Sequence, residues 1–251
     1  MSNIHIILQG KGGVGKSYVA FLMGQYFQSK GHKTLLLDTD PSNHTFSKVE
    51  SLGVQHYDIT DGDDVNQGRF DGLLTLLADF DGDEIVMDNG SGGYISFVSY
   101  LASSGAIEEL QDMGHQVFLH SVIVGAENLS ETFGSFKKMT ETLPNALFVL
   151  WLNHHLYGQI EHGGQSLLSS KTLKSLGGQL RAVIELPKRK EEVFGRDIRQ
   201  LMGSHLTFEE AVVDQKFHFM TRKRLRTVWK ETRAVLQDAG LETTKTTNEG
   251  E

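Results

Sequence analysis

A glycine-rich stretch holds the residue types that bind and transfer phosphate groups. It is the sequence Gly-Lys-Gly-Gly-Val-Gly-Lys-Ser at residues 10–17, between an apolar run at 4–8 and a helical pattern of apolar residues at 18–28. A glycine, four further residues and then Gly-Lys-Ser fit the phosphate-loop pattern, in which backbone N–H groups and a helix N-terminus surround a phosphate chain. In such a loop Lys16 contacts the β and γ phosphates and Ser17 ligates Mg²⁺.

The same stretch also satisfies the dinucleotide fingerprint, so the two patterns have to be separated. Gly10, Gly12 and Gly15 have the G-x-G-x-x-G spacing, and Asp38 lies where that motif places a ribose-binding acid. A dinucleotide site has no use for a lysine and a hydroxyl directly after its third glycine, whereas a nucleoside triphosphate with Mg²⁺ needs both. The Lys-Ser pair therefore favours the triphosphate, and the eight matching positions argue against a glycine-rich turn without a ligand.

Carboxylate and amide side chains follow other strand-like segments. Asp38 and Asp88 each end a short apolar run, and a glycine-rich segment follows Asp88. In a phosphate-loop fold, an aspartate at the end of a neighbouring strand orders the Mg²⁺ waters. Asp88 fits that role, although an aspartate is also common at a strand-end turn. Asn153, after another apolar run, could read the edge of adenine or could equally be a turn asparagine.

Apolar runs of strand length alternate with helical patterns along most of the chain. This order predicts an α/β fold of three layers, with a mostly parallel twisted sheet, helices on both faces and a binding site at the carboxyl ends of the strands. A single domain is expected over 1–240, followed by a disordered, polar tail over 241–251. The expected strands are 4–8, 33–37, 54–60, 84–88, 116–124, 146–152 and 179–186, and the expected helices are 18–28, 69–79, 94–103, 107–113, 127–142 and 215–238.

The composition excludes several other kinds of site. The chain of 251 residues has no cysteine, which removes disulfides, thiolate metal sites, iron–sulfur clusters and cysteine nucleophiles. A net charge of −8 argues against a uniformly basic nucleic-acid coat. The first apolar run is too short for a signal peptide and the others are too short to span a bilayer, so a cytoplasmic location is expected.

Three groups of charged or metal-binding residue types are better explained as solvated surface. Residues 61–64 are rich in aspartate but lack the closing glutamate of a Ca²⁺ loop, which favours a turn. His154, His155 and His162 share no helical i, i+4 spacing with a carboxylate, which favours loop histidines over a zinc site. The charged segment 188–197 is likewise expected to be a solvated helix face.

The last predicted helix carries a basic face. Arg222, Arg226, Lys230 and Arg233 follow one another at steps of four, four and three residues, so they share one side of the helix. On an acidic protein such a face could contact DNA phosphates or an anionic membrane surface, but basic residues also suit the outer side of any docked helix.

Together these motifs resemble those of the ParA/MinD class of ATPases, whose phosphate loop carries an extra lysine. Lys11 stands at that position. Four later segments are similar to the class's switch I segment (36–41), Walker B strand (86–88), adenine-contacting strand end (152–153) and loop under the base (186–187 followed by 194–196). Six stretches look closer to the TraL-type transfer proteins of conjugative plasmids, namely 5–10, 61–66, 87–90, 151–153, 160–162 and 192–197.

This resemblance implies a protein that hydrolyses ATP slowly with Mg²⁺, forms a homodimer with ATP and acts as a positional switch in conjugative DNA transfer. Lys11 would cross the dimer interface to the partner's phosphates, and Asp40 would orient the attacking water. The Mg²⁺ site would be formed by Ser17, Asp38 and Asp88. The expected catalytic residues are Lys11, Lys16 and Asp40, and the expected nucleotide-binding residues are Gly12, Gly13, Val14, Gly15, Lys16, Ser17, Tyr18, Asn153 and Pro187. Components of the conjugative DNA-processing or secretion machinery would be partners, with peripheral contact at the inner membrane face left open.

Two features depart from the class, and other functions stay open. The segment 89–93 is glycine-rich where partition ATPases usually carry a proline-containing segment, so its switch II response is expected to differ. Tyr18 stands where small or hydroxyl residues are common, which removes no catalytic group. The alternatives are a plasmid partition or stability ATPase, a small-molecule kinase or ligase on the same loop, a dinucleotide-dependent reductase, and a non-hydrolysing adaptor that binds DNA or membrane.

Overall fold

A parallel β-sheet of seven strands forms the centre of the part of the chain that the structure describes. The computed structural model is described for all residues except 42, 63, 156–159, 163–164 and 244–251. The strands lie in the order β11-β8-β7-β1-β6-β2-β3. They are β1 (Asn3–Ile7), β2 (Thr34–Asp38), β3 (Gln55–His56), β6 (Glu84–Asp88), β7 (Gln116–Val124), β8 (Leu147–Asn153) and β11 (Leu180–Leu186). Because every pair in this sheet is parallel, all carboxyl ends meet at one edge, as the alternating order predicted.

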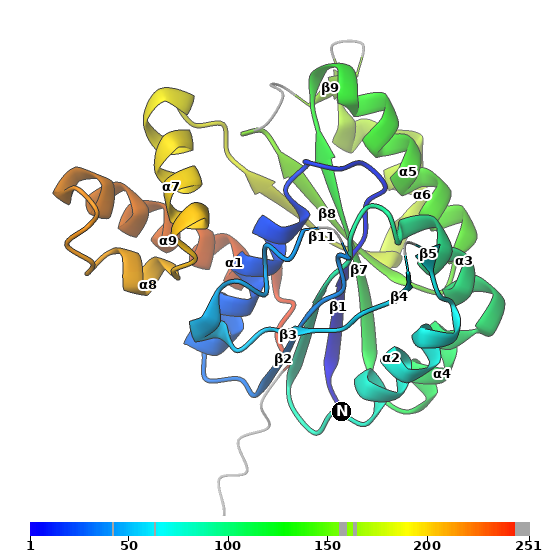
Figure 1. Cartoon of the computed structure of the whole chain (residues 1–251). Helices are drawn as coiled ribbons and strands as arrows, with labels where there is room; N and C mark the ends of the chain where they lie inside the picture. Colours follow the sequence, from blue (N-terminus) through cyan, green and yellow to red (C-terminus); the bar gives the residue numbers. More distant parts are fainter. Residues whose placement is uncertain (42, 63, 156–159, 163–164, 244–251) are drawn as a thin grey trace, which may run out of the picture.

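Helices cover both faces of the sheet, so the predicted three-layer α/β fold is confirmed (Figure 1). One face is covered by α1 (Lys16–Ser29), α7 (Arg196–Ser204), α8 (Phe208–Ala211) and α9 (Phe219–Ala239). The other face is covered by α2 (Gly68–Ala78), α3 (Tyr94–Ser104), α4 (Ala106–Asp112), α5 (Leu129–Thr142) and α6 (Lys171–Leu176). The shorter strands form two antiparallel pairs, β4 (Thr60–Asp61) with β5 (Asp64–Val65) and β9 (Glu161–His162) with β10 (Gln165–Ser166). The short 3₁₀ helices are η1 (Glu50–Leu52), η2 (Ala126–Asn128), η3 (Leu167–Ser169) and η4 (Gly177–Gln179), and η5 (Glu191–Gly195) is a π-helical turn.

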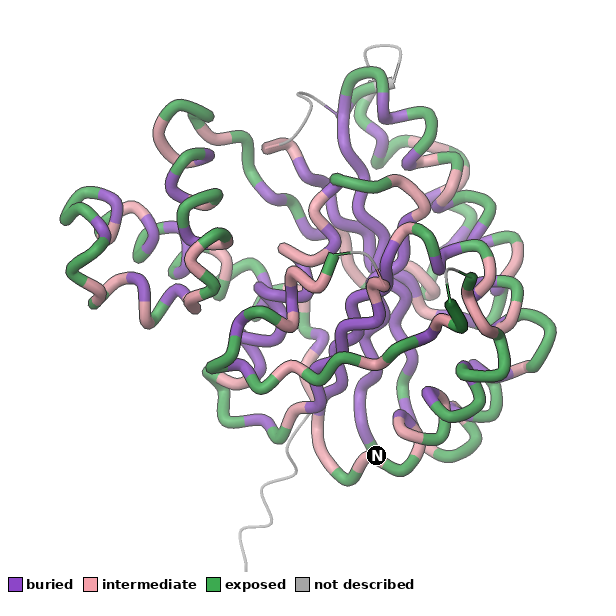
Figure 2. The backbone as a smooth tube through the Cα atoms, in the orientation of Figure 1, coloured by how far each residue is buried: buried purple, intermediate pink, exposed green. Residues whose placement is uncertain are grey.

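The central strands are buried on both sides, which explains their nearly continuous apolar sequences (Figure 2). Successive side chains of a strand point to opposite faces of the sheet. In β1, Ile4 and Ile6 pack against the helices α2 to α5 on one face, whereas Ile7 packs against α1 on the other. His5 lies on the α1 side as well, where it stacks on Phe27 with ring centroids 5.1 Å apart. The alternation therefore places polar side chains inside the α1 face of the sheet.

A chain of four buried polar side chains crosses this face, and we call Trp151, His120, His5 and Glu84 the polar chain. The indole N–H of Trp151 donates to His120 Nδ1 at 2.9 Å, so that nitrogen carries no proton. Burial lowers the pKa of His120 well below its usual value, which leaves the neutral ring with its proton on Nε2. This N–H donates to His5 Nδ1, and His5 Nε2–H donates to Glu84 Oε2, both at 3.0 Å. Every ring nitrogen in the polar chain is therefore paired.

The segment after α9 folds back onto the sheet, which differs from the predicted disordered tail over 241–251. Leu241 is buried, and its carbonyl accepts a hydrogen bond from Asn3 Nδ2 at 3.0 Å. The N–H of Thr243 donates to Glu84 Oε1 at 2.6 Å. Residues 241–243 are thus tied to β1 and β6, and residues 244–251 lie outside the described part.

Three further elements differ from the prediction. Instead of one strand over 54–60, only β3 pairs with the sheet, and Asp58 accepts hydrogen bonds from both the N–H and the hydroxyl of Thr60 in a turn. The helices α7 and α8 were not predicted, and α8 begins with a capping box between Thr207 and Glu210. Among the described residues, no helix is both long and apolar enough to cross a membrane.

Candidate functional site

The glycine-rich loop lies between β1 and α1, at the carboxyl edge of the sheet. Gly13 and Gly15 have φ values of 73° and 103°, in the left-handed region that favours glycine. Gly15 is the N-cap of α1, and no side chain of the described residues caps that end of the helix. The first N–H groups of α1 therefore face the loop and can bind an anion.

The side chain of Lys16 folds into this loop. It is buried, and its ammonium donates to the carbonyl oxygen of Lys11 at 3.3 Å. Burial lowers its pKa, while the carboxylates of Asp88 and Asp40 act in the opposite direction. The structure thus places the Lys16 ammonium against the backbone of the phosphate loop, near Asp88 and Asp40.

Asp88, at the end of β6, is the most strongly perturbed acid of the site. It is 1% exposed, and neither of its carboxylate oxygens has a hydrogen-bond partner among the described residues. Burial raises its pKa to about 7, and Asp38 and Asp40 add to the increase, whereas the nearby Ser17 hydroxyl and Lys16 reduce it. A buried carboxylate without hydrogen bonds, close to a hydroxyl and two further acids, suits a divalent cation with oxygen ligands. The residues present therefore fit Mg²⁺.

Asp38 and Asp40 hold the segment that follows β2. Asp38 pairs in register with Asp88, and its two oxygens accept the N–H groups of Asp40 at 3.1 Å and Ser47 at 2.9 Å. Asp40 in turn rests against Gly90: a Cβ there would lie 2.7 Å from Asp40 Cγ. A glycine at position 90 is thus required by the close approach of the two loops.

Lys11, the extra lysine of the loop, points to the surface. Its side chain is 35% exposed, and its ammonium pairs with Glu131 of α5 at 2.9 Å. The pair is partly solvated, so its contribution to stability is about 1 kcal/mol or less.

A cavity of about 450 Å³ opens beside the loop, between β8, α7 and α9. It is lined by four of the predicted nucleotide-binding residues, Gly15, Tyr18, Asn153 and Pro187. Asn153 Nδ2 donates to the carbonyl of Val14 at 3.0 Å, and its oxygen accepts the N–H of His155. Asn153 therefore also fixes the phosphate loop to β8, a role that the sequence did not indicate.

Leu186 and Gly195, which belong to the predicted loop under the base, also line the cavity, but several other walls were missed by the sequence analysis. Ile198 and Met202 of α7 supply apolar surface, and His155, Arg189 and Arg199 supply polar groups. Burial, with help from the two arginines, lowers the pKa of His155. Apolar spacing at 198, 201 and 202 was the signal that could have revealed α7.

The segment predicted as a solvated face is anchored at one residue. Asp197 is 1% exposed and pairs with Arg224 of α9, and it also accepts a hydrogen bond from the Thr221 hydroxyl. Arg224 is therefore used in packing α9 against α7. On the predicted basic face of α9, Arg226, Lys230 and Arg233 are exposed and Arg222 is half-buried.

Comparison with known proteins agrees with this geometry. Residues 5–198 match the family described as the CobQ/CobB/MinD/ParA nucleotide binding domain. The chain is 40% identical over 242 residues to a protein named TraL from Escherichia coli, covering 96% of this chain and 100% of that protein. It is also similar in fold to the cell division ATPase MinD of Pyrococcus furiosus, with a TM-score of 0.55 and 15% identity over 95% of this chain and 99% of that chain. The septum site-determining protein MinD with Mg-ADP, from Pyrococcus horikoshii OT3, has a TM-score of 0.52 and 14% identity over 95% and 99%.

Proposed function

Because the chain belongs to the CobQ/CobB/MinD/ParA family of nucleotide-binding domains, we propose that it binds and slowly hydrolyses ATP with Mg²⁺. The observation that carries this proposal is the buried, unpaired Asp88 carboxylate beside Lys16 and Ser17, at the open end of α1. Such a group is costly to bury unless a ligand completes it. A triphosphate with Mg²⁺ would supply negative charge to pair with Lys16 and positive charge to pair with Asp88.

The binding roles follow from position. The N–H groups of residues 12–17 and the Lys16 ammonium would hold the phosphates, and the cavity at Tyr18 and Pro187 would take the base. Ser17, Asp88 and, through its charge, Asp38 would hold Mg²⁺, which neutralises the phosphate oxygens when bound. The complex of the related MinD with Mg-ADP supports this assignment.

Asp40 is the proposed residue that orients the attacking water. Its charge acts on Lys16 and Asp88, so it lies within the same cluster, and its backbone is fixed by Asp38 and Gly90. A carboxylate held there can accept a hydrogen bond from water in line with the γ phosphate.

We further propose that ATP binding is coupled to dimerisation through Lys11. Its ion pair with Glu131 is solvated and weak, so the long side chain can leave it and reach the phosphates of a second subunit. Two subunits would then complete each other's sites only in the ATP state, and hydrolysis would release them.

Similarity to the TraL protein supports a positional role in conjugative plasmid transfer, with the transfer machinery as partner. The exposed basic residues of α9 would be the surface for a polyanion, either DNA or an anionic membrane. If charge reversal at Arg226 and Lys230 abolished plasmid transfer while Lys16→Ala did not, a non-hydrolysing adaptor would replace the ATPase switch as the proposed function.

The first test is the mass of the protein in solution with MgADP and with a non-hydrolysable MgATP analogue. We expect a dimer only with the analogue. Lys11→Ala should bind the analogue but stay monomeric, whereas Lys138→Ala, an exposed lysine on α5, should dimerise like the wild type. Full analogue-driven dimerisation of Lys11→Ala contradicts the role across the interface, and a mass independent of nucleotide contradicts the switch.

A further inference from the structure

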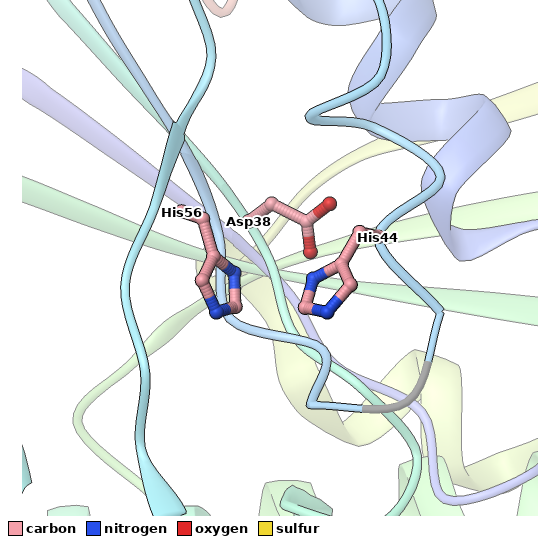
Figure 3. A group of neighbouring side chains, drawn as sticks. All are labelled: Asp38, His44 and His56. Carbon is pink, nitrogen blue, oxygen red and sulfur yellow. The ribbon is translucent and has the colours of Figure 1, made fainter.

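A second group of potential metal ligands lies at the edge of the sheet. Asp38 ends β2, His56 ends the neighbouring strand β3, and the two residues pair in register. His44 comes from the segment that connects these strands and folds over them (Figure 3). One ligand atom from each of the three side chains lies within 4.8 Å of the other two.

The side chains converge without bonding to one another. Figure 3 shows a ring nitrogen of each histidine turned toward the Asp38 carboxylate and toward the other ring. His44 Nδ1 is buried and has no hydrogen-bond partner among the described residues. The two rings meet edge to face, with centroids 4.3 Å apart. A buried, unpaired nitrogen that points at a carboxylate and a second imidazole is costly without a ligand.

We propose that Asp38, His44 and His56 bind a divalent transition-metal ion of the Zn²⁺ type. Two neutral imidazoles and one carboxylate are the donor set of three-ligand zinc sites, which leave a fourth position for water. In tetrahedral coordination the ligand atoms are about 3.3 Å apart, so ligand atoms that now lie within 4.8 Å of one another have to approach by up to about 1.5 Å. His56 is exposed and can move by that amount, while Asp38 is fixed by two backbone N–H groups.

This site differs in chemistry from the proposed Mg²⁺ site next to it. Mg²⁺ prefers oxygen ligands and keeps its waters, so it fits Ser17 and Asp88, whereas nitrogen ligands favour Zn²⁺, Co²⁺ or Ni²⁺. The two sites meet at Asp38, whose carboxylate also holds the backbone of Asp40. A metal bound here fixes the segment that carries Asp40, so the ion has a route to influence the nucleotide site.

The test is Co²⁺ and Zn²⁺ binding to the full chain without a histidine tag, in excess Mg²⁺ and without nucleotide. We expect one ion per chain, with Co²⁺ visible absorption typical of four nitrogen and oxygen ligands. His44→Ala and His56→Ala should each weaken binding by about tenfold or more. His162→Ala, which removes a histidine outside the group, should bind like the wild type.

The outcomes separate this site from the nucleotide site. Lys16→Ala, which is expected to lose ATP, should still bind one Zn²⁺. Absence of stoichiometric binding by the wild type overturns the site, as does binding that survives in either His44→Ala or His56→Ala. Circular dichroism of the two variants checks that a loss of binding is not a loss of fold.

Discussion

Glu84 and Asp88 stand at opposite ends of the same strand, are both buried, and face the same helix α1, yet their surroundings are opposite. Glu84 accepts hydrogen bonds from His5 and from the N–H of Thr243, and completes the polar chain. Asp88 accepts none from the described residues, and burial raises its pKa to about 7. The fold itself supplies hydrogen bonds to one carboxylate, whereas for the other we propose a bound cation.

This difference separates structural from functional polar groups without reference to any relative. A buried network with every donor and acceptor paired adds rigidity. A single buried acid without a partner destabilises the folded state, and a bound cation would remove that cost. Substitutions that convert each acid to its amide should therefore have opposite effects.

The largest effect is expected for Asp88→Asn in the absence of nucleotide and Mg²⁺. The pKa near 7 means that the folded protein keeps a proton that the unfolded chain releases above pH of about 4. The free energy of unfolding of the wild type therefore falls between about pH 4 and pH 7, by up to about 4 kcal/mol. Urea unfolding at pH 8 should show the variant to be more stable, and the gain should disappear near pH 4.

The same variant should lose Mg²⁺-dependent ATP hydrolysis, since the stabilised site no longer attracts the cation. A variant that is less stable than the wild type at pH 8 would show that the Asp88 carboxylate is already satisfied, and the contrast with Glu84 would fail.

Glu84→Gln should act in the other direction, with a loss of about 2 kcal/mol in the free energy of unfolding. The amide oxygen can accept from His5 or from Thr243 but not from both, so its NH₂ group faces a second donor. If the His5 proton moved from Nε2 to Nδ1, His5 and His120 would each direct an N–H at the other ring. His120 cannot move its own proton to Nδ1, because that nitrogen already accepts from Trp151. Denaturant unfolding measures the loss, with Glu109→Gln, at an exposed glutamate, as the control.

Gly90→Ala tests the glycine-rich segment on the Asp88 side. A methyl group there meets Asp40 Cγ at 2.7 Å and Cα at 3.0 Å, so the Asp40 segment has to shift, at a cost of about 1 to 2 kcal/mol. The rate of ATP turnover should fall strongly while the free energy of unfolding changes only by that amount, because the shift displaces Asp40, the proposed water-orienting group. Gly92→Ala, with open space around its Cβ, should behave like the wild type, and equal turnover of both variants would reject the contact as a constraint.

The smallest effect per subunit is expected for the exposed pair at the rim of the site. Glu131→Gln removes a Lys11 interaction worth about 1 kcal/mol at most. A homodimer contains two such pairs, so the dimer with the ATP analogue should tighten by no more than about 30-fold. Sedimentation at several protein concentrations measures this. Glu141→Gln, which breaks the Lys137 pair on the same helix, is the matched control, and a similar gain there would point to net charge instead.

Local patterns were enough to predict the sheet and the loop. The strands 84–88 and 116–124 lie where the apolar runs predicted, and Asp88 ends its strand. These elements are defined by a run of apolar residues between turns, which a single segment of sequence contains. The phosphate loop is similarly local, because its glycines, lysine and serine are consecutive.

What the sequence could not provide depends on contacts between distant segments. Directly bonded partners in the polar chain are up to 115 positions apart, and His5 or Trp151 alone looks like an ordinary strand residue. Asp197 looked solvated because its partner, Arg224, is on another helix. The cluster of Asp38, His44 and His56 exists only because β3 pairs with β2.

The contact of Thr243 with Glu84 also concerns the order in which the protein is made. Synthesis proceeds from the N-terminus, so all seven strands of the sheet precede the residue that donates this second N–H. A growing chain that has already formed β1, β6, β7 and β8 still contains Glu84 without that donor. Residues 241–243 are thus synthesised after the whole sheet, and a chain interrupted at residue 240 would have the phosphate loop and all seven strands but a buried Glu84 that lacks the Thr243 donor.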